Sequence, residues 1–172
     1  MKIIIISLLL AISFNSLGQE KSTDAAFLYV VKDDLEGTQF FTPSYDMVVS
    51  NEEKTEGAKL SMHLKKSGSF SFITAKLIGL GNCVDDNELI ILFENGEKLQ
   101  STSWNDFNCK GDAYFNITKE GQLLLSSEPM KTIRVRNGES FKTVTSSDFS
   151  NPLYFVQLFD SINTESYTLL ED

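Results

Sequence analysis

Two cysteines, Cys83 and Cys109, have the most distinctive chemistry in this chain. A redox pair favours Cys-x-x-Cys spacing, and a zinc site needs more ligands than two cysteines and the single histidine, His63. The segment between the cysteines contains a predicted hairpin, 88–102, whose two arms bring the flanking residues back together. We therefore expect one structural disulfide, Cys83 to Cys109, which closes the open end of this hairpin.

Acids and amides lie beside both cysteines. Ca²⁺ prefers carboxylate and amide oxygens, but an EF-hand loop counted from Asp106 would place Lys110 and Ile117 at ligand positions, which neither can fill. Loops also use these residue types simply to form turns, so we expect a solvated turn region and no bound metal or other cofactor. The residues that could still form a ligand or ion surface are Asp85, Asp86, Glu88, Trp104, Asp106 and Asp112.

His63 would have to serve as the base in any Ser-His-Asp or Cys-His mechanism, because the chain has no other histidine. It alternates with Met62 and Leu64 in a predicted strand, which indicates that its side chain faces solvent. The sequence contains no Gly-x-Ser-x-Gly motif and no phosphate-binding glycine loop. These patterns argue against nucleophilic catalysis, whereas glycoside hydrolysis needs only two well-placed acids and stays open.

Trp104 and the thirteen phenylalanines supply aromatic faces that could stack on a sugar or a peptide. The alternative is that phenylalanine fills the core of a small domain, where large rings supply much of the buried apolar area. For Trp104, which lies in a polar run beside Cys109, we expect packing against the disulfide rather than an exposed platform.

Short strands must position these residues. Alternation of apolar and polar residues recurs from about Ala25 to Phe141 and predicts many strands joined by turns. Turns at Asn95-Gly96, Gly121 and Asn137-Gly138 predict three hairpins, and the Asn-Gly pairs suit type I′ turns. The predicted strands are 26–32, 38–41, 59–65, 69–78, 88–93, 97–102, 113–118, 122–126, 131–136 and 139–144.

The C-terminal part changes to a helical period. Ser150 or Asn151 can cap a helix and Pro152 suits its first position. The apolar residues Phe155, Leu158, Phe159 and Ile162 then share one face, which predicts one helix lying across the sheet. The remaining residues, 164–172, are expected to form a loose tail or a last edge strand, and the polar window 51–57 a mobile loop.

The first nineteen residues have the layout of a secretory signal: Lys2, an apolar run from Ile3 to Phe14, and small residues before Gln19. This run is shorter than the roughly 20 residues that span a membrane, and no later run is longer. We expect cleavage near Gln19 and export to the periplasm or the medium, where an oxidising environment favours the disulfide. Residues 20–172 are predicted to form a single β-rich domain.

The formal net charge of −9 excludes some partners. Nucleic acids and anionic lipids are recognised by basic stripes, which this chain lacks. A protein or glycan partner in the cell envelope stays open.

Six stretches follow one another along the chain: VKDDLEGT, LSMHLKK, NCVDDNELIILFENGEKL, FNCKGDAYF, IRVRNGESF and YFVQLF. Their order resembles a family of small exported β-rich proteins of Gram-negative bacteria that has no assigned function. The resemblance implies the disulfide and the order of strands, and it implies no catalytic or ligand-binding residue.

The sequence therefore predicts a mostly β fold, namely an antiparallel, sandwich-like sheet domain with one C-terminal α-helix and one disulfide. The predicted function is a non-catalytic binding or interaction module. The alternatives are a carboxylate-based hydrolase acting on cell-envelope or glycan material, and a β module stabilised by Ca²⁺ at its acid-rich turns.

Overall fold

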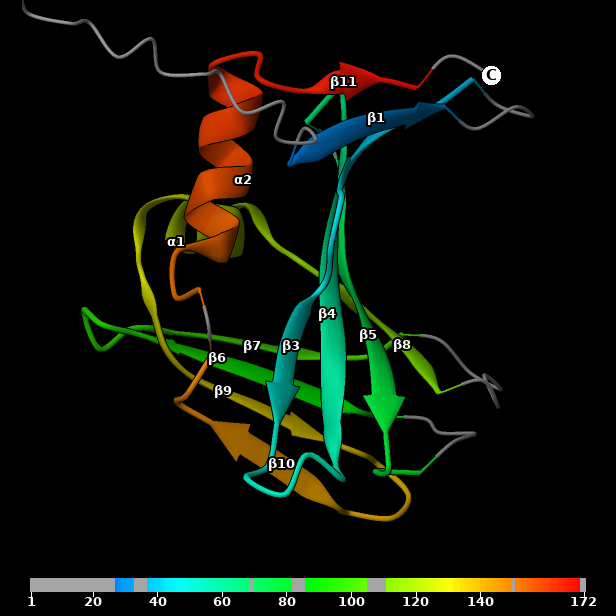
Figure 1. Ribbon diagram of the computed structural model, residues 1–172, viewed down its shortest axis with the longest axis vertical. Coiled ribbons are helices and arrows are strands. Elements are labelled where there is room, and N and C mark those ends of the chain that lie inside the picture. The colour runs from blue at the N-terminus through cyan, green and yellow to red at the C-terminus, as the bar shows by residue number, and fades with distance from the viewer. Residues whose placement is uncertain are drawn as a thin grey trace, which may run out of the picture.

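The computed structural model describes residues 27–32, 37–68, 70–81, 86–104, 111–149 and 151–170. Within these ranges the chain is mostly β, with two sheets and two helices (Figure 1). The strands are β1 (Leu28–Lys32), β2 (Gln39–Pro43), β3 (Met47–Ser50), β4 (Gly57–Lys65), β5 (Ser71–Ile78), β6 (Glu88–Phe93), β7 (Lys98–Thr102), β8 (Asp112–Asn116), β9 (Met130–Arg136), β10 (Thr143–Ser146) and β11 (Thr168–Leu169). The helices are α1 (Lys119–Ser127) and α2 (Tyr154–Asn163).

The larger sheet has the order β11-β1-β2-β4-β5-β8, and β3 pairs with the first half of β4. The smaller sheet has the order β10-β9-β6-β7. All of these described pairs are antiparallel except β1 and β11, which are parallel. The antiparallel prediction is therefore confirmed for the hairpin-connected strands and wrong for the last strand, whose pairing confirms the edge-strand alternative for the C-terminal segment.

The two sheets enclose an apolar core, and their strands run in clearly different directions (Figure 1). On one side an isolated bridge between Ser103 and Phe115 joins the sheets, and on the other β10 lies beside β3. Inward positions alternate with outward ones along each strand, as period-two patterns require. Fully buried core residues from both sheets include Leu60, Met62, Ile73, Leu89, Ile91, Phe93, Phe115 and Ile133.

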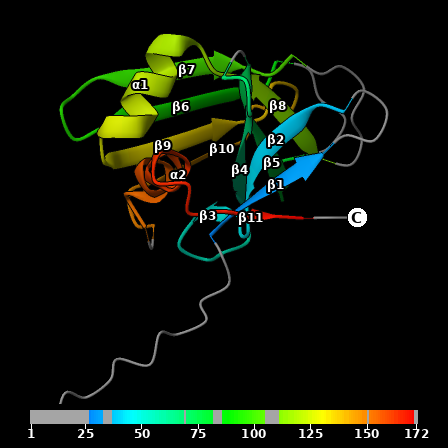
Figure 2. The same cartoon turned by 90° about the horizontal axis from the view of Figure 1, so that it is seen from above.

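Both helices lie on one side of the larger sheet and over the smaller one (Figures 1 and 2). They pack against each other, and α2 also contacts β1. The apolar face of α2 contains the fully or nearly fully buried Phe155 and Leu158 and the partly buried Phe159 and Ile162, which confirms the predicted helix face. Asn151 Oδ1 accepts a hydrogen bond from the Leu153 N–H at 3.0 Å, just before the helix begins.

The sequence prediction for the segment before β9 is wrong. Residues 122–126 are not a strand and Gly121 does not form a hairpin turn, because both belong to α1. The Thr118 side chain caps this helix by accepting a hydrogen bond from the Gly121 N–H, and Pro129 follows its C-terminal end. A Cβ on Gly121 would lie 2.9 Å from Leu99 Cδ1, so glycine permits close packing of α1 on β7. The described part of the chain therefore contains two helices where one was predicted.

The hairpin at Asn95-Gly96 is confirmed, but its turn is not of type I′. Gly96 has a positive φ of 88°, whereas Asn95 does not have a positive φ. The Gly96 N–H donates to Phe93 O at 3.0 Å, and the Phe93 N–H donates to Glu97 O at 2.9 Å. This is a three-residue connection with glycine in the left-handed position, the arrangement of a type I turn with a G1 bulge.

The hairpin at Asn137-Gly138 is also confirmed, with a longer loop than predicted. β10 begins at residue 143, not 139, because the buried Asn137 side chain organises the intervening residues. Its Oδ1 accepts hydrogen bonds from the Glu139 N–H at 3.1 Å and the Ser140 N–H at 2.8 Å. The left-handed position is taken by Phe141, with a φ of 56°, and not by Gly138.

The β3 strand was not predicted, and the 51–57 window that follows it is a hydrogen-bonded connection to β4. Asn51 Oδ1 accepts hydrogen bonds from the backbone N–H groups of Thr55 and Glu56, at 2.9 and 3.1 Å. Asn51 Nδ2 also donates to the Thr55 hydroxyl at 3.0 Å. A polar side chain thus satisfies the backbone where the sequence offers no apolar anchor.

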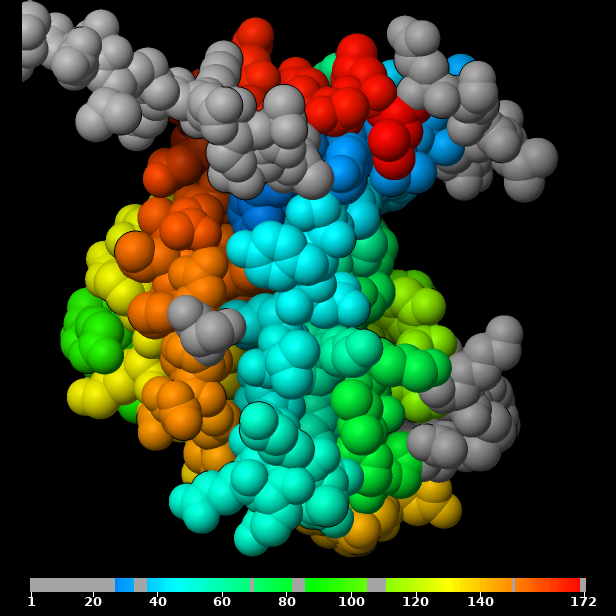
Figure 3. All heavy atoms as spheres, viewed as in Figure 1, coloured from blue at the N-terminus to red at the C-terminus, as the bar shows by residue number. Residues whose placement is uncertain are grey.

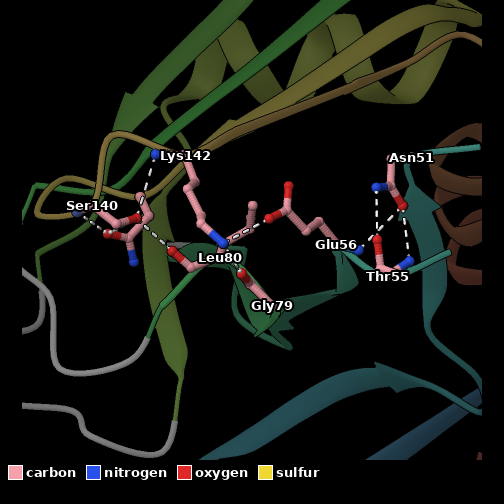
Figure 4. Close-up of polar contacts among 8 residues, drawn as sticks. Asn51, Thr55, Glu56, Gly79, Leu80, Ser140 and Lys142 are labelled. Atoms are coloured by element: carbon pink, nitrogen blue, oxygen red, sulfur yellow. Dashed lines mark hydrogen bonds and ion pairs between the residues drawn. The ribbon is translucent and has the colours of Figure 1, made fainter. Parts of the chain in front are cut away.

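Polar contacts link the two sheets near the loop before β10 (Figure 4). Lys142 Nζ forms an ion pair with Glu56 Oε1 at 2.7 Å and donates to Gly79 O at 3.1 Å. The Ser140 hydroxyl donates to Leu80 O. These contacts join the loop before β4, the end of β5 and the loop before β10.

Neither helix in the described part of the chain is long and apolar enough to cross a bilayer.

Candidate ligand-binding surfaces

The expected disulfide and two of the five acids of the predicted ligand or ion surface lie outside the described residues. Cys83, Cys109, Asp85 and Asp106 all belong to segments that the structure does not describe. The disulfide therefore stays a prediction. Among the residues that are described, no group of three or more His, Cys, Asp or Glu side chains could hold a metal ion.

The other three acids of the predicted surface are separate from one another in their contacts. Asp86 is exposed and has a positive φ of 56°. Glu88 Oε1 accepts a hydrogen bond from Gln100 Nε2 at 2.8 Å. Asp112 Oδ1 lies 3.0 Å from Lys76 Nζ across the β5–β8 pair. Each of these acids has the environment of an ordinary turn or surface residue.

A buried asparagine joins the two stretches that flank the cysteines. The Asn87 backbone N–H donates to Ser103 Oγ at 3.1 Å, and Asn87 Nδ2 donates to the same oxygen at 3.2 Å. The Ser103 N–H donates in return to Asn87 O at 2.8 Å. The sequence placed Asn87 among the solvated amides, but its side chain is buried and stabilises the place where the chain passes between the sheets.

Trp104 is exposed. Its exposed fraction is 54%, and its ring centroid lies 5.4 Å from that of Tyr114. This exposure contradicts the packed position expected for Trp104, and the alternative of an exposed platform describes this side chain, while the cysteines that it was expected to pack against lie outside the described residues.

Five rings lie in a continuous chain across the outer face of the larger sheet. We call this set the aromatic row; its members are Phe40 of β2, His63 of β4, Phe72 of β5, Tyr114 of β8 and Trp104. Phe72 is central, with its ring centroid 6.1 Å from Phe40, 4.9 Å from His63 and 6.2 Å from Tyr114. Trp104 extends the row beyond Tyr114.

Strand alternation explains why the row faces outward. Phe40, Phe72 and Tyr114 are only partly buried, and each precedes an inward residue that is buried: Phe41, Ile73 and Phe115. Strand pairing then brings the outward positions together, with His63 directly opposite Phe72. The sequence suggested ring stacking in general terms, but it contained no signal for which rings would meet.

Hydrogen bonds determine the tautomer of His63. The Thr74 hydroxyl donates to Ser61 O at 3.2 Å, so its oxygen can accept from His63 Nε2–H at 3.3 Å. His63 Nδ1 is then the acceptor for the Thr42 hydroxyl at 3.2 Å. A neutral ring with its proton on Nε2 satisfies all three side chains.

His63 is on the predicted outer face but is half-buried instead of facing open solvent. Its ring stacks on Phe72 at an interplanar angle of 21°. Burial lowers the pKa of His63, and the negative charge of Asp46 opposes this shift in part. The neutral form is therefore the one that the row favours.

A second surface is a cavity of about 550 Å³ between the turn after β2 and the second half of α2. We call it the aromatic cavity; its lining residues are Phe27, Tyr45, Gln157, Asp160, Ser161, Thr164 and Ser166. Figure 3 shows α2 alongside the β2–β3 segment on this side of the molecule. The sequence did not predict this site, because it depends on α2 lying beside a turn that is more than a hundred residues away.

Tyr154 is buried and contacts two of the residues that line the aromatic cavity, Phe27 and Tyr45. Its hydroxyl donates to Tyr45 O at 2.6 Å, and its ring lies 5.6 Å from Phe27 and 5.7 Å from Tyr45. Burial raises the pKa of Tyr154 well above its ordinary value, and the negative charge of Asp46 adds to this shift. The tyrosine thus remains a hydrogen-bond donor at neutral pH and holds the Tyr45 backbone in place.

No family model matches this chain, and no curated protein matches it with significant similarity. Its function is therefore inferred from these surfaces alone.

Proposed function

We propose that this chain is an exported, non-catalytic binding module and that the aromatic row is its ligand platform. The observation that carries this proposal is a set of five rings in contact on an outer sheet face. Outward strand positions are commonly polar, because they face water. Rings that are left half-exposed there can bury apolar area when a ligand stacks on them.

A neutral glycan chain is the ligand that the row favours. Sugar rings carry C–H faces that stack on aromatic side chains, and hydroxyls that pair with neutral polar groups. Thr42 and Thr74 lie beside the rings through their hydrogen bonds to His63. Nucleic acid bases also stack on aromatic sheets, but their phosphates need cations, and this chain has a net charge of −9.

The geometry of the rings favours a single glycan chain over a flat polysaccharide surface. Neighbouring ring planes differ by 73° between Phe40 and Phe72, by 46° between Phe72 and Tyr114, and by 44° between Tyr114 and Trp104. Such a platform is not planar, as expected on a twisted sheet. A separate chain can rotate from one sugar unit to the next and follow these planes.

Export and the disulfide belong to the same proposal. The N-terminal signal layout supports export, and export supports oxidation of the two cysteines. Asn87 lies four residues after Cys83, and Ser103 lies six residues before Cys109. Hydrogen bonds join Asn87 to Ser103, so two described residues close in sequence to the two cysteines lie side by side.

The test is a binding measurement with the oxidised mature chain and a panel of neutral oligosaccharides, using calorimetry and product analysis. We expect saturable binding that weakens about ten-fold in Trp104→Ala and in Phe72→Ala, equivalent to about 1.4 kcal/mol. Leu92→Ala, an outward residue of the smaller sheet, is the matched control and should bind like the wild type. Cleavage of the oligosaccharides, or binding that the two row variants leave unchanged, would contradict the proposal.

A further inference from the structure

We propose that the aromatic cavity binds a small organic cation of the alkylammonium class. This site is separate from the aromatic row and does not depend on the function proposed for it. Three features of the described residues support a cation: the aromatic wall, the charge of the opposite wall, and the direction of the hydroxyl hydrogen bonds.

The aromatic wall consists of Phe27 and Tyr45. Their ring centroids lie 5.1 Å apart and their planes are inclined by 51°, so the two rings are tilted against each other instead of being stacked. Tyr45 has an exposed fraction of 52%, which leaves part of its ring accessible. The faces of aromatic rings attract cations through their quadrupoles, within about 6 Å of the ring centroid.

The opposite wall is negative. Asp160 is the only charged residue among the seven that line the cavity, and none of these is a lysine or arginine. The same wall is the C-terminal end of α2, whose last turn has no basic residue. Because helix C-termini carry partial negative charge, both the carboxylate and the helix end favour a cation.

The hydroxyls of this wall are set up to accept hydrogen bonds. Ser161 Oγ donates to Gln157 O at 2.8 Å, and Thr164 Oγ1 donates to Asp160 O at 2.7 Å. Each hydroxyl has a single proton, so the Ser161 oxygen keeps two lone pairs for a ligand, and the Thr164 oxygen keeps one because the Ser166 hydroxyl, 3.0 Å away, donates to it. Acceptors suit the N–H or O–H groups of an amine or amino alcohol, whereas an anion would need donors.

The cavity size fits a small ligand. A volume of about 550 Å³ lies within the range of roughly 300 to 1,000 Å³ that is typical of small-molecule sites. The hydrogen bond from Tyr154 to Tyr45 O holds the aromatic wall against α2, so the site is formed before a ligand arrives.

Choline and its neutral isostere 3,3-dimethylbutan-1-ol provide a direct test, because the two differ in charge and hardly in shape. We expect choline to cause saturable NMR shifts at Phe27 and Tyr45 in the oxidised mature chain at low salt, and the isostere to bind at least about five-fold more weakly. Asp160→Asn should weaken choline binding by about the same factor. Asp148→Asn removes an equal charge from another exposed position and should leave binding unchanged.

Equal binding of choline and the isostere would overturn the proposal. So would equal losses in Asp160→Asn and Asp148→Asn, because net charge rather than the site would then govern binding. A second variant, Trp104→Ala, separates this inference from the proposed function: its glycan binding should weaken about ten-fold, while its choline binding should stay unchanged. Circular dichroism of each variant confirms that it is folded.

Discussion

The outer faces of the two sheets differ in chemistry although both follow the same alternation. On the smaller sheet, long polar side chains bond to one another across strands. Gln100 Nε2 donates to Glu88 Oε1 at 2.8 Å, and Arg134 Nε donates to Thr145 Oγ1 at 3.1 Å. The outward positions of β6 also carry the aliphatic Ile90 and Leu92, so this face mixes polar and aliphatic side chains.

On the larger sheet, the corresponding outward positions carry the aromatic row. The polar groups beside it, Thr42 and Thr74, are neutral and form hydrogen bonds with the single histidine, His63. The difference shows that alternation determines which residues face outward, whereas the type of residue placed there distinguishes a solvated face from a candidate binding face.

The largest change in the free energy of unfolding is expected when two neighbouring residues of β5, Ile73 and Phe72, are compared. Ile73 is fully buried, and Ile73→Ala should lower the free energy of unfolding by about 2–5 kcal/mol through lost burial and a cavity. Phe72→Ala should lower it by about 1 kcal/mol, because Phe72 makes cross-strand contacts on the outer face. Urea unfolding measures both. Equal losses would show that the row is part of the core rather than a ligand platform.

The next largest change in stability is expected from the disulfide proposed between Cys83 and Cys109. It would join the two connections that carry the chain between the sheets. Reduction should lower the free energy of unfolding by roughly 3 kcal/mol, since the unfolded chain loses a closed loop. The measurement is urea unfolding with and without a reductant. A double variant, Cys83→Ser with Cys109→Ser, should not respond to the reductant. Labelling of free thiols in the unreduced, denatured protein would refute the bridge.

The smallest effect is the part of the pH dependence of stability that arises from His63 in the aromatic row. Because burial lowers the pKa of folded His63, the unfolded chain binds a proton more readily. The stability due to the neutral ring is therefore fully present above pH 6.5, the ordinary pKa of histidine, and is lost as the pH falls through the lower folded pKa. His63→Gln should remove this part of the pH dependence. Urea unfolding of both proteins between about pH 8 and 5.5 gives the free energy of unfolding as a function of pH. The same pH dependence in the wild type and in His63→Gln would contradict the prediction.

Strong local patterns predicted most of the strands and the C-terminal helix. β6 was predicted with the bounds that the structure shows, and β4, β5 and β9 differ from their predictions by no more than two residues at either end. These strands alternate clearly, and side-chain alternation is a property of the local backbone. The apolar face of α2 was predictable for the same reason.

The segment that forms α1 was not predictable from alternation. Leucines at 123–125 fit a strand as well as a helix, and Gly121 looks like a turn residue. The distinguishing signals were the Thr118 cap and Pro129 after the helix. The role of Gly121 depends on its contact with Leu99, which comes from a distant strand.

The sequence by itself determined which side chains face inward along each strand, because that depends only on the period of the backbone. Tertiary structure alone decided which outward rings meet. The aromatic row combines residues from β2, β4, β5 and β8, and the aromatic cavity sets Tyr45 beside α2. Strand order and helix docking arise from many weak contacts between distant segments, so no short stretch of sequence contains enough information to specify them.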